Sequence, residues 1–324
     1  MQPDYSKLQF DRQGNLRHFL SIKGIGIELI SQLLEDAEKY LTAPGTLAPR
    51  SKSLAGRTIG NLFFEPSTRT RASFDLAGRR LGADVLNLDV NTSSRKKGES
   101  ILDTIHTLQA MQVDIMVVRD ASDGVPAYIA RNVDDHVSVL NAGESDVSHP
   151  TQGLLDLMTI RQHNNDFKNM VVAIVGDIQH SRVAMSTAEA LQTMGIGELR
   201  LISPAALSPT SDRFPGAYVF DNLAKGLKDA DVIMALRIQR ERIGNIEGVP
   251  NIDEYYANYG ISHDSLEYAK PDAIVMHPGP MNRGIEIEGS IADGPRSVIT
   301  KQVTNGVAIR MAVLDRIGQM MNER

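Results

Sequence analysis

The feature that most constrains this chain is a regular alternation between two kinds of segment. Short runs of apolar residues are separated by longer segments in which apolar residues recur at the spacing of an α-helix. Strands of a parallel sheet are covered by helices on both faces, so they read as short continuous apolar runs. The pattern therefore predicts an α/β fold of alternating strands and helices. We expect strands at 58–64, 84–90, 114–118, 137–140, 171–175, 199–203, 232–236 and 273–276.

The length of the chain predicts two domains. The 324 residues exceed the ~150 residues that one domain typically holds. We place the boundary at His149–Pro150, which gives a first domain of residues 1–149 and a second of residues 150–299. Residues 204–216 read as an exposed loop, because prolines and hydroxyl residues gather there. Residues 298–321 read as one long helix, and we expect about residues 300–324 to pack back on the first domain.

The composition excludes several classes of function. The 34 basic and 40 acidic residues give a net charge of −6, which argues against a nucleic-acid-binding surface held by bulk positive charge. The chain has no cysteine, which removes disulfides, a thiolate nucleophile and Cys-ligated metal centres. The histidines are scattered and no metal-binding motif occurs, so we predict no metal and no other cofactor.

The apolar runs also bear on the location of the protein. No run approaches the ~20 residues that a membrane helix needs. Residues 1–10 lack the basic-then-apolar order of a secretory signal. We therefore expect a cytoplasmic protein that does not interact with membranes.

The strongest chemical signal lies where the first predicted strand ends, in the segment FFEPSTRTR at residues 63–71. Pro66 interrupts the strand, and Ser67 is a favourable N-cap for a following helix. The first turn of such a helix offers unpaired N–H groups and the positive end of the dipole, and here it also carries Arg69 and Arg71. Two cations oppose the dipole, so we predict a bound anion, above all a phosphate. The alternative is an ordinary capped helix with solvated arginines.

Other polar residues also follow predicted strands. His149, in the segment HPTQ at 149–152, is placed where α/β sheets bind ligands, and it can donate to a carbonyl oxygen that develops negative charge. A plain helix cap is the alternative. Arg237 and Gln239, in RIQRER, alternate outward from a strand end and either point into a cleft or belong to a solvated loop. The segment HPGP at 277–280 is a rigid turn, a cleft wall or both.

Two further segments are weaker signals. The segment GDIQHSR at 176–182 follows a strand but lacks the second and third glycines of a dinucleotide-binding loop. The segment NTSSRKKGE at 91–99 is polar and basic, which is typical of a surface loop, although its cations are able to close over an anion.

Together the motifs FFEPSTRTR, HPTQGLLDL, GDIQHSR, RIQRER and HPGPMNRG resemble, in content and order, the catalytic chain of the aspartate carbamoyltransferases. The resemblance extends from about Lys52 to the C-terminal helix. It implies two α/β domains, each a mostly parallel sheet flanked by helices, with the active site in the cleft between them. One domain would bind carbamoyl phosphate and the other L-aspartate.

The resemblance also implies roles for individual residues. Ser67, Thr68, Arg69 and Thr70 would hold the phosphate, Arg119 would bridge phosphate and carbonyl, His149 would bond the carbonyl oxygen, and Gln152 would bond the carbamoyl amide. Arg182, Arg237 and Gln239 would grip the two carboxylates of aspartate, and the Gly279–Pro280 backbone would line the cleft. Ser93 and Lys97 would reach into a neighbouring subunit's site. The residues implied in catalysis are Thr70, Lys97, Arg119 and His149.

Shared sites of this kind imply a homotrimer. Whether two trimers assemble with regulatory or dihydroorotase-like subunits is left open by the sequence. The implied reaction needs no metal and no cofactor, because the amine of aspartate attacks the carbonyl carbon of carbamoyl phosphate and phosphate leaves. It would make N-carbamoyl-L-aspartate, an early intermediate of pyrimidine biosynthesis.

Two rival interpretations remain. Ornithine carbamoyltransferases share the phosphate half of the site, but ornithine brings a cationic side chain, whereas Arg237 and Gln239 suit a carboxylate. The cysteine of the ornithine enzymes' HCLP motif is also absent from 277–280. A non-catalytic homologue is the second rival, and the presence of all the implied site residues argues against it.

Overall fold

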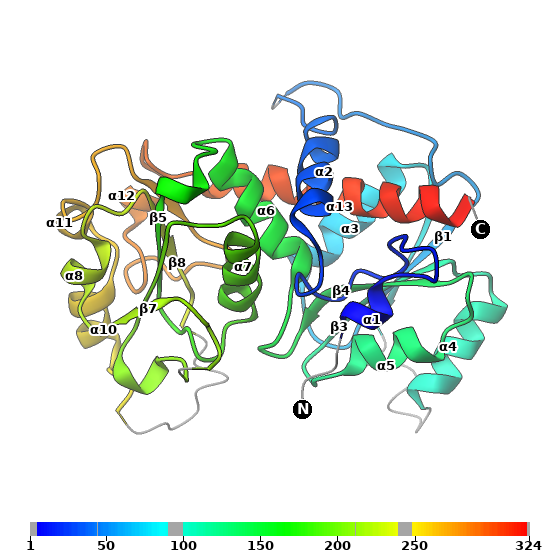
Figure 1. Cartoon of the computed structure of the whole chain (residues 1–324), viewed down its shortest axis with the longest axis horizontal. Helices are drawn as coiled ribbons and strands as arrows, with labels where there is room; N and C mark the ends of the chain where they lie inside the picture. Colours follow the sequence, from blue (N-terminus) through cyan, green and yellow to red (C-terminus); the bar gives the residue numbers. More distant parts are fainter. Residues whose placement is uncertain (1–4, 44, 90–99, 211, 239–247, 323–324) are drawn as a thin grey trace. The chain divides into compact units, whose positions relative to one another are not determined.

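The computed structural model describes residues 5–43, 45–89, 100–210, 212–238 and 248–322 (Figure 1). The chain divides into two compact units, Met1–Leu155 with Thr304–Arg324 and Asp156–Val303. Each unit contains one parallel sheet flanked by helices, so the predicted α/β architecture is confirmed. Both points of division fall inside helices, namely α6 (Pro150–Arg161) and α13 (Ile299–Asn322).

The sheet of the first unit has four strands in the order β2-β1-β3-β4, all parallel. The strands are β1 (Thr58–Phe63), β2 (Asp84–Asp89), β3 (Ile115–Asp120) and β4 (Ser138–Glu144). Their predicted positions are confirmed, except that β4 runs on to Glu144 through polar residues that are nevertheless buried. Because all the strands are parallel, the residues that follow β1, β3 and β4 emerge at the same edge of the sheet.

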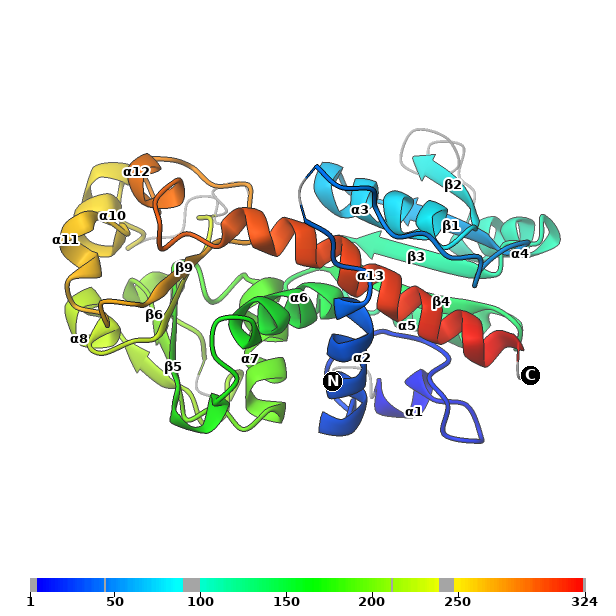
Figure 2. The same cartoon turned by 90° about the horizontal axis from the view of Figure 1, so that it is seen from above.

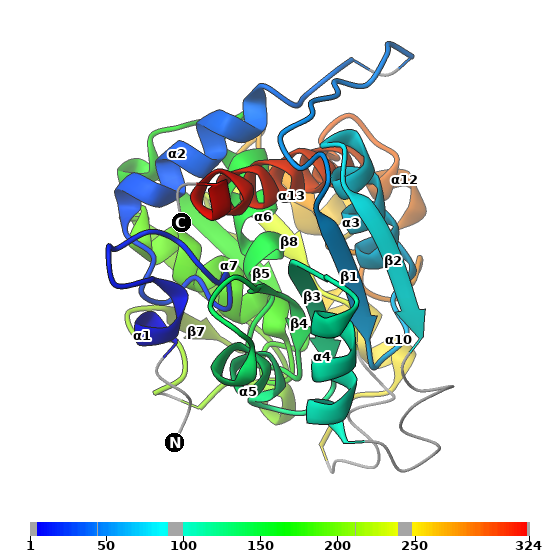
Figure 3. The ribbon, with the colours of Figure 1, turned by 90° about the vertical axis from the view of Figure 1, so that its right-hand side faces the viewer.

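Helices cover both faces of this sheet (Figure 3). The helices of the unit are α1 (Ser6–Gln9), α2 (Ile27–Glu38), α3 (Thr68–Arg80), α4 (Ile101–Ala110) and α5 (Val125–Asn132), with the start of α6 and most of α13. Apolar residues of α4 and α5, among them Ile105 and Ile129, pack with Leu62, Met116 and Val139 of the strands. On α3, Gly78 lies so close to Ile59 and Val85 that a Cβ would collide with both side chains. The helix and the sheet are therefore in direct contact there.

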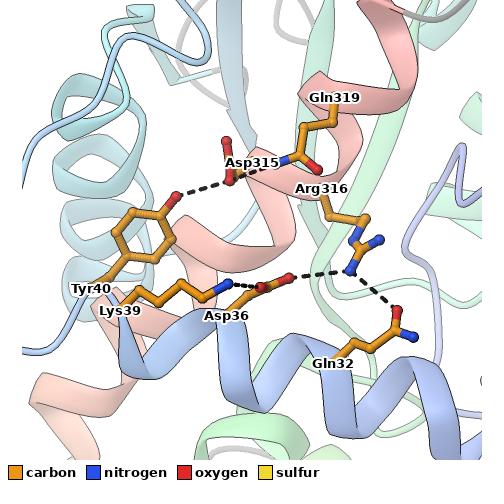
Figure 4. A network of polar contacts seen from close by, with 7 residues as sticks. All are labelled: Gln32, Asp36, Lys39, Tyr40, Asp315, Arg316 and Gln319. Carbon is orange, nitrogen blue, oxygen red and sulfur yellow. Dashed lines mark hydrogen bonds and ion pairs between the residues drawn. The ribbon is translucent and has the colours of Figure 1, made fainter.

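The C-terminal helix α13 lies between α2 and α3 in the first unit (Figure 2). The Arg310 guanidinium lies 5.1 Å from the ring centre of Phe74 on α3. On the side of α13 that faces α2 the contacts are hydrogen bonds: the Tyr40 hydroxyl donates to Asp315 at 2.9 Å, and Arg316 donates to Asp36 at 3.2 Å (Figure 4). These contacts join the last helix to the N-terminal part of the chain.

The sheet of the second unit has five parallel strands in the order β7-β6-β5-β8-β9. They are β5 (Val171–Val175), β6 (Glu198–Ile202), β7 (Tyr218–Phe220), β8 (Val232–Ala235) and β9 (Ile274–Met276). All except β7 match predicted strands. The end of β5 lies beside that of β8, and β8 lies beside β9, so the loops after these strands emerge together.

Helices flank the second sheet as well. They are α7 (Arg182–Thr193), α8 (Leu223–Leu227), α10 (Ile252–Tyr259), α11 (His263–Leu266) and α12 (Gly289–Ala292). Figure 1 shows α7 on one side of β5 and β8, with α8 and α11 on the other. Leu227 of α8 and Leu266 of α11 belong to one apolar cluster with Ala173 and Val275 of the sheet. No helix in the described part of the chain is both long enough and apolar enough to cross a membrane.

Candidate active site

The first group of predicted site residues begins α3, directly after β1. Ser67 occupies the predicted N-cap position with an extended backbone, φ −159°, although its hydroxyl makes no capping hydrogen bond. No acidic residue lies in the first turn; Thr68 and Arg69 are exposed, and Thr70 is buried. The first N–H groups of a helix have no intrahelical acceptor, so this end presents N–H groups, hydroxyls and a guanidinium together. It has the chemistry of an anion site.

Arg119 lies near the end of β3, the strand beside β1. The pairing of β3 with β4 changes register between Val118 and Asp120, and such an irregularity turns the intervening side chain away from its regular direction. The Arg119 guanidinium donates to the Ala142 carbonyl at 3.1 Å and lies 2.7 Å from the Glu65 carboxylate. Glu65 follows β1, so the ion pair joins the ends of the two strands. Its side chains are 13% and 14% exposed, which limits screening by water.

His149 and Gln152 lie at the start of α6, after β4. Both side chains are buried, and the Gln152 N–H donates to the His149 carbonyl at 2.9 Å. Thr70 follows β1, Arg119 is the last residue but one of β3, and His149 and Gln152 follow β4, so all four lie towards the carboxyl ends of neighbouring strands. A buried histidine, an arginine and a threonine are the kind of donors that stabilise a developing oxyanion.

A buried carboxylate, which sequence reasoning missed, organises the loop before His149. Glu144 is 0% exposed and accepts hydrogen bonds from the Tyr5 hydroxyl, the Gly124 N–H and the Asn141 amide. Burial raises the pKa of Glu144, although these hydrogen bonds act in the opposite direction. The side chain ties the end of β4 to the start of α5 and to the N-terminal segment. The only sequence signal was an acidic residue in an apolar, glycine-containing run.

In the second unit, Arg182 begins α7 after β5. It is 7% exposed, and the preceding residue, Ser181, caps the helix by accepting from the Ala184 N–H at 3.1 Å. Between β5 and α7, the Asp177 carboxylate is fully buried and lies 2.8 Å from Nδ1 of His180. Residues 176–178, 181 and 182 are buried and residues 179 and 180 are partly buried, so most of the GDIQHSR segment is shielded from solvent.

Arg237 and the Gly279–Pro280 pair follow β8 and β9. Arg237 is partly buried and comes two residues after the end of β8. The Gly279–Pro280 peptide bond is cis, and Gly279 has a φ of +65°, which favours glycine. The second sheet thus brings Arg182, Arg237 and the 279–280 backbone to one edge, since β5, β8 and β9 are neighbours. Ser93, Lys97 and Gln239, also predicted site residues, lie outside the described residues.

Tyr255 on α10 adds a buried hydroxyl to this part of the unit. Burial raises the pKa of Tyr255, and the charges of Glu286 and Asp177 raise it further, so the phenol stays neutral. Among the described residues, no group of three or more His, Asp or Glu side chains is arranged to hold a metal ion.

Polar and cationic groups at the carboxyl edges of two parallel sheets are typical of an α/β enzyme with anionic substrates. Residues 17–162 match the carbamoyl-P binding domain of the aspartate/ornithine carbamoyltransferases, and residues 168–317 match their Asp/Orn binding domain. The chain therefore belongs to the aspartate/ornithine carbamoyltransferase family.

Solved structures of both branches of the family are similar to this chain. The catalytic subunit of aspartate transcarbamoylase from M. jannaschii is 32% identical, with a TM-score of 0.80, over 95% of this chain and 100% of that one. Aspartate transcarbamoylase from Trypanosoma cruzi, solved with carbamoyl aspartate and phosphate, is 28% identical, with a TM-score of 0.82, over 98% of each chain. Ornithine carbamoyltransferase from Pyrococcus furiosus is 29% identical, with a TM-score of 0.79, over 92% of this chain and 96% of that one.

Proposed function

We propose that this protein transfers the carbamoyl group of carbamoyl phosphate to the α-amino group of L-aspartate, giving N-carbamoyl-L-aspartate and phosphate. The observation that carries the choice of aspartate is the pair of arginines at the edge of the second sheet. Arg182 and Arg237 follow β5 and β8, which are adjacent strands. Two guanidiniums match the two carboxylates of aspartate, whereas they would repel the side-chain ammonium of ornithine.

The carboxylates at the same edge do not offset this preference. Asp177 lies against His180, and Glu286 lies against His277, so each has a neighbouring imidazole within the second unit. An ornithine ammonium would need an acidic partner, and both of these carboxylates are buried against imidazoles of their own unit. The edge therefore favours an anionic acceptor.

In the proposed first half of the site, the start of α3 binds the phosphate. Ser67, Thr68, Arg69 and Thr70 supply hydroxyls, N–H groups and one positive charge. Arg119 bridges the phosphate and the carbonyl oxygen, and it exchanges its contact with Glu65 for one with the substrate. His149 donates to the carbonyl oxygen, and Gln152 bonds the carbamoyl amide.

The proposed reaction requires the amine of aspartate in its neutral form. The amine lone pair forms a C–N bond to the carbonyl carbon, and the carbonyl π electrons move to oxygen, where Thr70, Arg119 and His149 stabilise the negative charge. The C–O bond to phosphate then breaks with its electron pair, and the phosphate accepts the proton that the amine loses. Binding both substrates in one geometry is able to supply about 7–11 kcal/mol of the barrier reduction.

We further propose that the active enzyme is a homotrimer in which Ser93 and Lys97 complete a neighbouring subunit's site. Lys97→Ala and Arg69→Ala chains are each expected to be inactive. If the sites are composite, mixing the two after dissociation restores part of the activity, because some sites then receive both residues intact. Mixed trimers without any recovered turnover would contradict shared sites.

The experiment that tests the proposed function is a steady-state assay of carbamoyl phosphate with L-aspartate and, separately, with L-ornithine. We expect N-carbamoyl-L-aspartate and phosphate in equal amounts and no carbamoylated ornithine. Turnover of ornithine alone would overturn the proposal, and turnover of neither amino acid would favour a non-catalytic homologue.

Single variants then assign the roles. Replacing Arg237 with Ala removes a charge-assisted hydrogen bond worth about 1.5–3 kcal/mol, which raises KM for aspartate by roughly 10–150-fold. His149→Ala removes an oxyanion donor and lowers kcat by about 10²–10³-fold. Arg131→Ala, at an exposed arginine on the last turn of α5, is the control and leaves both constants unchanged.

A further inference from the structure

A buried histidine forms hydrogen bonds with the loop that follows β9. His277 is 1% exposed, and its Nδ1 atom accepts a hydrogen bond from the Gly279 N–H at 2.8 Å. A backbone N–H can only donate, so Nδ1 carries no proton and the hydrogen of the neutral ring is on Nε2. That atom lies 3.2 Å from Oε1 of Glu286, to which it donates. The geometry fixes the tautomer of His277 and links it to a carboxylate.

Glu286 closes the loop at its other end. The same Oε1 atom accepts from the Asn282 N–H, so one carboxylate holds the first and the last residue of the segment 277–282. Glu286 is itself fixed, because its carbonyl accepts from the Ile261 N–H at 3.0 Å, and Ile261 is fully buried in the apolar cluster of the unit. Gly279 and Pro280 lie within the segment that this side chain spans.

A second buried side chain anchors the start of the segment. Gln302 accepts from the His277 N–H at 2.9 Å through Oε1 and donates to Asp156 at 2.8 Å through Nε2. The other oxygen of Asp156 accepts from the Thr187 hydroxyl at 2.9 Å. All of these side chains are buried. The chain of hydrogen bonds connects α7, α6 and α13 to the residue that begins the loop.

Burying a carboxylate is costly, and a well-packed apolar side chain of similar size is often as stable or more stable. A glutamate whose oxygen bridges two points of one loop is therefore better explained by the geometry it imposes than by stability. Arg283, in the same loop, forms an exposed ion pair with Asp293, and such pairs contribute little to rigidity. The loop's conformation depends mainly on the buried contacts.

We propose that Glu286 is a positioning residue for the amino-acid substrate: through His277 and Asn282 it sets the Gly279–Pro280 backbone that the acceptor contacts, with Gln302 as the second anchor. The inference rests on the proposed function, together with the role that the family resemblance implies for this backbone, which is to line the acceptor site. Glu286 itself does not touch the substrate. Its loss is expected to act on the binding of the amino acid and not on that of the phosphate.

The test compares Glu286→Leu with Glu286→Gln in the full chain. Leucine has a similar volume but no acceptor, whereas glutamine keeps Oε1 as an acceptor for both N–H groups. We expect Glu286→Leu to raise KM for the amino acid about tenfold or more, from the loss of buried hydrogen bonds. Its kcat and its Kd for inorganic phosphate, measured by calorimetry, stay within about twofold of wild type. Glu286→Gln restores KM to within about threefold of wild type.

Amide exchange gives a direct readout of the loop, and a second variant keeps the proposal testable if Glu286→Leu does not fold. Exchange of the Gly279 and Asn282 amides is expected to speed up in Glu286→Leu, while exchange in β5 stays unchanged. His277→Asn keeps an acceptor for Gly279 through Oδ1 but loses the link to Glu286, so it should raise KM even if Glu286→Leu does not fold. Wild-type KM in both Glu286→Leu and His277→Asn would overturn the proposal. So would equal KM increases in the leucine and glutamine variants.

A failure of the proposed function can be told apart from a failure of the positioning role of Glu286. If the wild-type protein carbamoylates ornithine and not aspartate, the proposed function fails. The positioning role is then tested by the same variants with ornithine as the acceptor. An unchanged KM for ornithine in Glu286→Leu would overturn it independently.

Discussion

Gly176, at the end of β5, occupies a position where an added methyl group has no room, and Gly176→Ala tests how the second sheet places Arg237. Its φ is +138°, a conformation that L-residues rarely adopt, and a Cβ would lie 2.8 Å from the carbonyl oxygen and 2.9 Å from the Cβ of Leu236. Leu236 is held in place, because its N–H donates to the Val175 carbonyl at 2.8 Å. The neighbour therefore cannot move aside without breaking the pairing of β5 with β8.

The magnitude follows from two terms. The strained backbone costs an alanine about 1–3 kcal/mol, and the displaced Leu236 loses a hydrogen bond of about 1 kcal/mol. Together they lower the stability of the second unit by about 2–4 kcal/mol. Arg237 directly follows Leu236, so the displacement also moves the guanidinium, and we expect KM for aspartate to rise at least about tenfold.

Native-state hydrogen exchange, followed by mass spectrometry, measures the loss of stability within the second unit. A loss of 2–4 kcal/mol corresponds to amides in β5 and β8 exchanging about 30–1000-fold faster. Gly195→Ala is the matched control: its φ is +75° and its Cβ would meet no atom within 4 Å, so it carries only the conformational term. If Gly176→Ala and Gly195→Ala have the same exchange rates and the same KM, the contact with Leu236 has no effect and the reasoning is wrong.

Three further expectations concern side chains outside the site. Burial, and then the hydrogen bond with Asp315, raises the pKa of Tyr40, so the folded protein loses stability as the pH rises above the usual tyrosine value of about 10. Denaturant titrations should show a smaller alkaline loss for Tyr40→Phe, and no change for the exposed Tyr128→Phe. The hydrogen bond with Arg283 lowers the pKa of Asp293, so this pair stabilises the fold above the usual Asp range and ceases to do so as the pH falls. The difference between Arg283→Gln and wild type in thermal melts should therefore shrink at acid pH. Phe74→Leu, at a fully buried ring beside Arg310, should cost about 1–3 kcal/mol by denaturant midpoint, whereas Leu76→Ala, at an exposed position on the same helix, should cost less than 1 kcal/mol.

The sequence predicts most strands because most of them are buried on both faces. The strand that the sequence did not predict is β7, which pairs only with β6 and lies at the edge of its sheet. Tyr218 and Val219 are 59% and 51% exposed, so the strand lacks the continuous apolar run that identifies the others. The strand β2 is also a partly exposed edge strand, but Val85, Leu86 and Leu88 identify it. The end of β4 was also missed, because Asn141 and Glu144 read as loop residues although the structure buries both. Periodicity detects burial of apolar residues and does not detect buried polar networks.

Candidate site residues are easier to predict than the partners that hold them. Parallel strands end at one edge, so a polar residue directly after a predicted strand has a defined place, as Arg119 and Arg237 have. Arg182 comes seven residues after its predicted strand, at the start of the next helix. Which carboxylate contacts Arg119 depends on the tertiary pairing of β1 with β3, and no local pattern contains that information. The same is true of Glu144 and Tyr5, which are far apart in the chain.

A net charge of −6 and the two anionic substrates proposed for this protein are compatible because of where the acidic residues near the sheet edges lie. Glu65 lies against Arg119, Asp177 against His180 and Glu286 against His277, each within its own unit. Of these neighbours only the Arg119 guanidinium carries a permanent positive charge, so it is the Glu65 pair that reduces the repulsion of an incoming anion. The Glu65 carboxylate also keeps the Arg119 guanidinium in place and compensates its charge at this edge of the sheet. In the proposed site, a phosphate that displaces Glu65 exchanges one anionic partner of Arg119 for another, so the guanidinium stays paired when the donor binds.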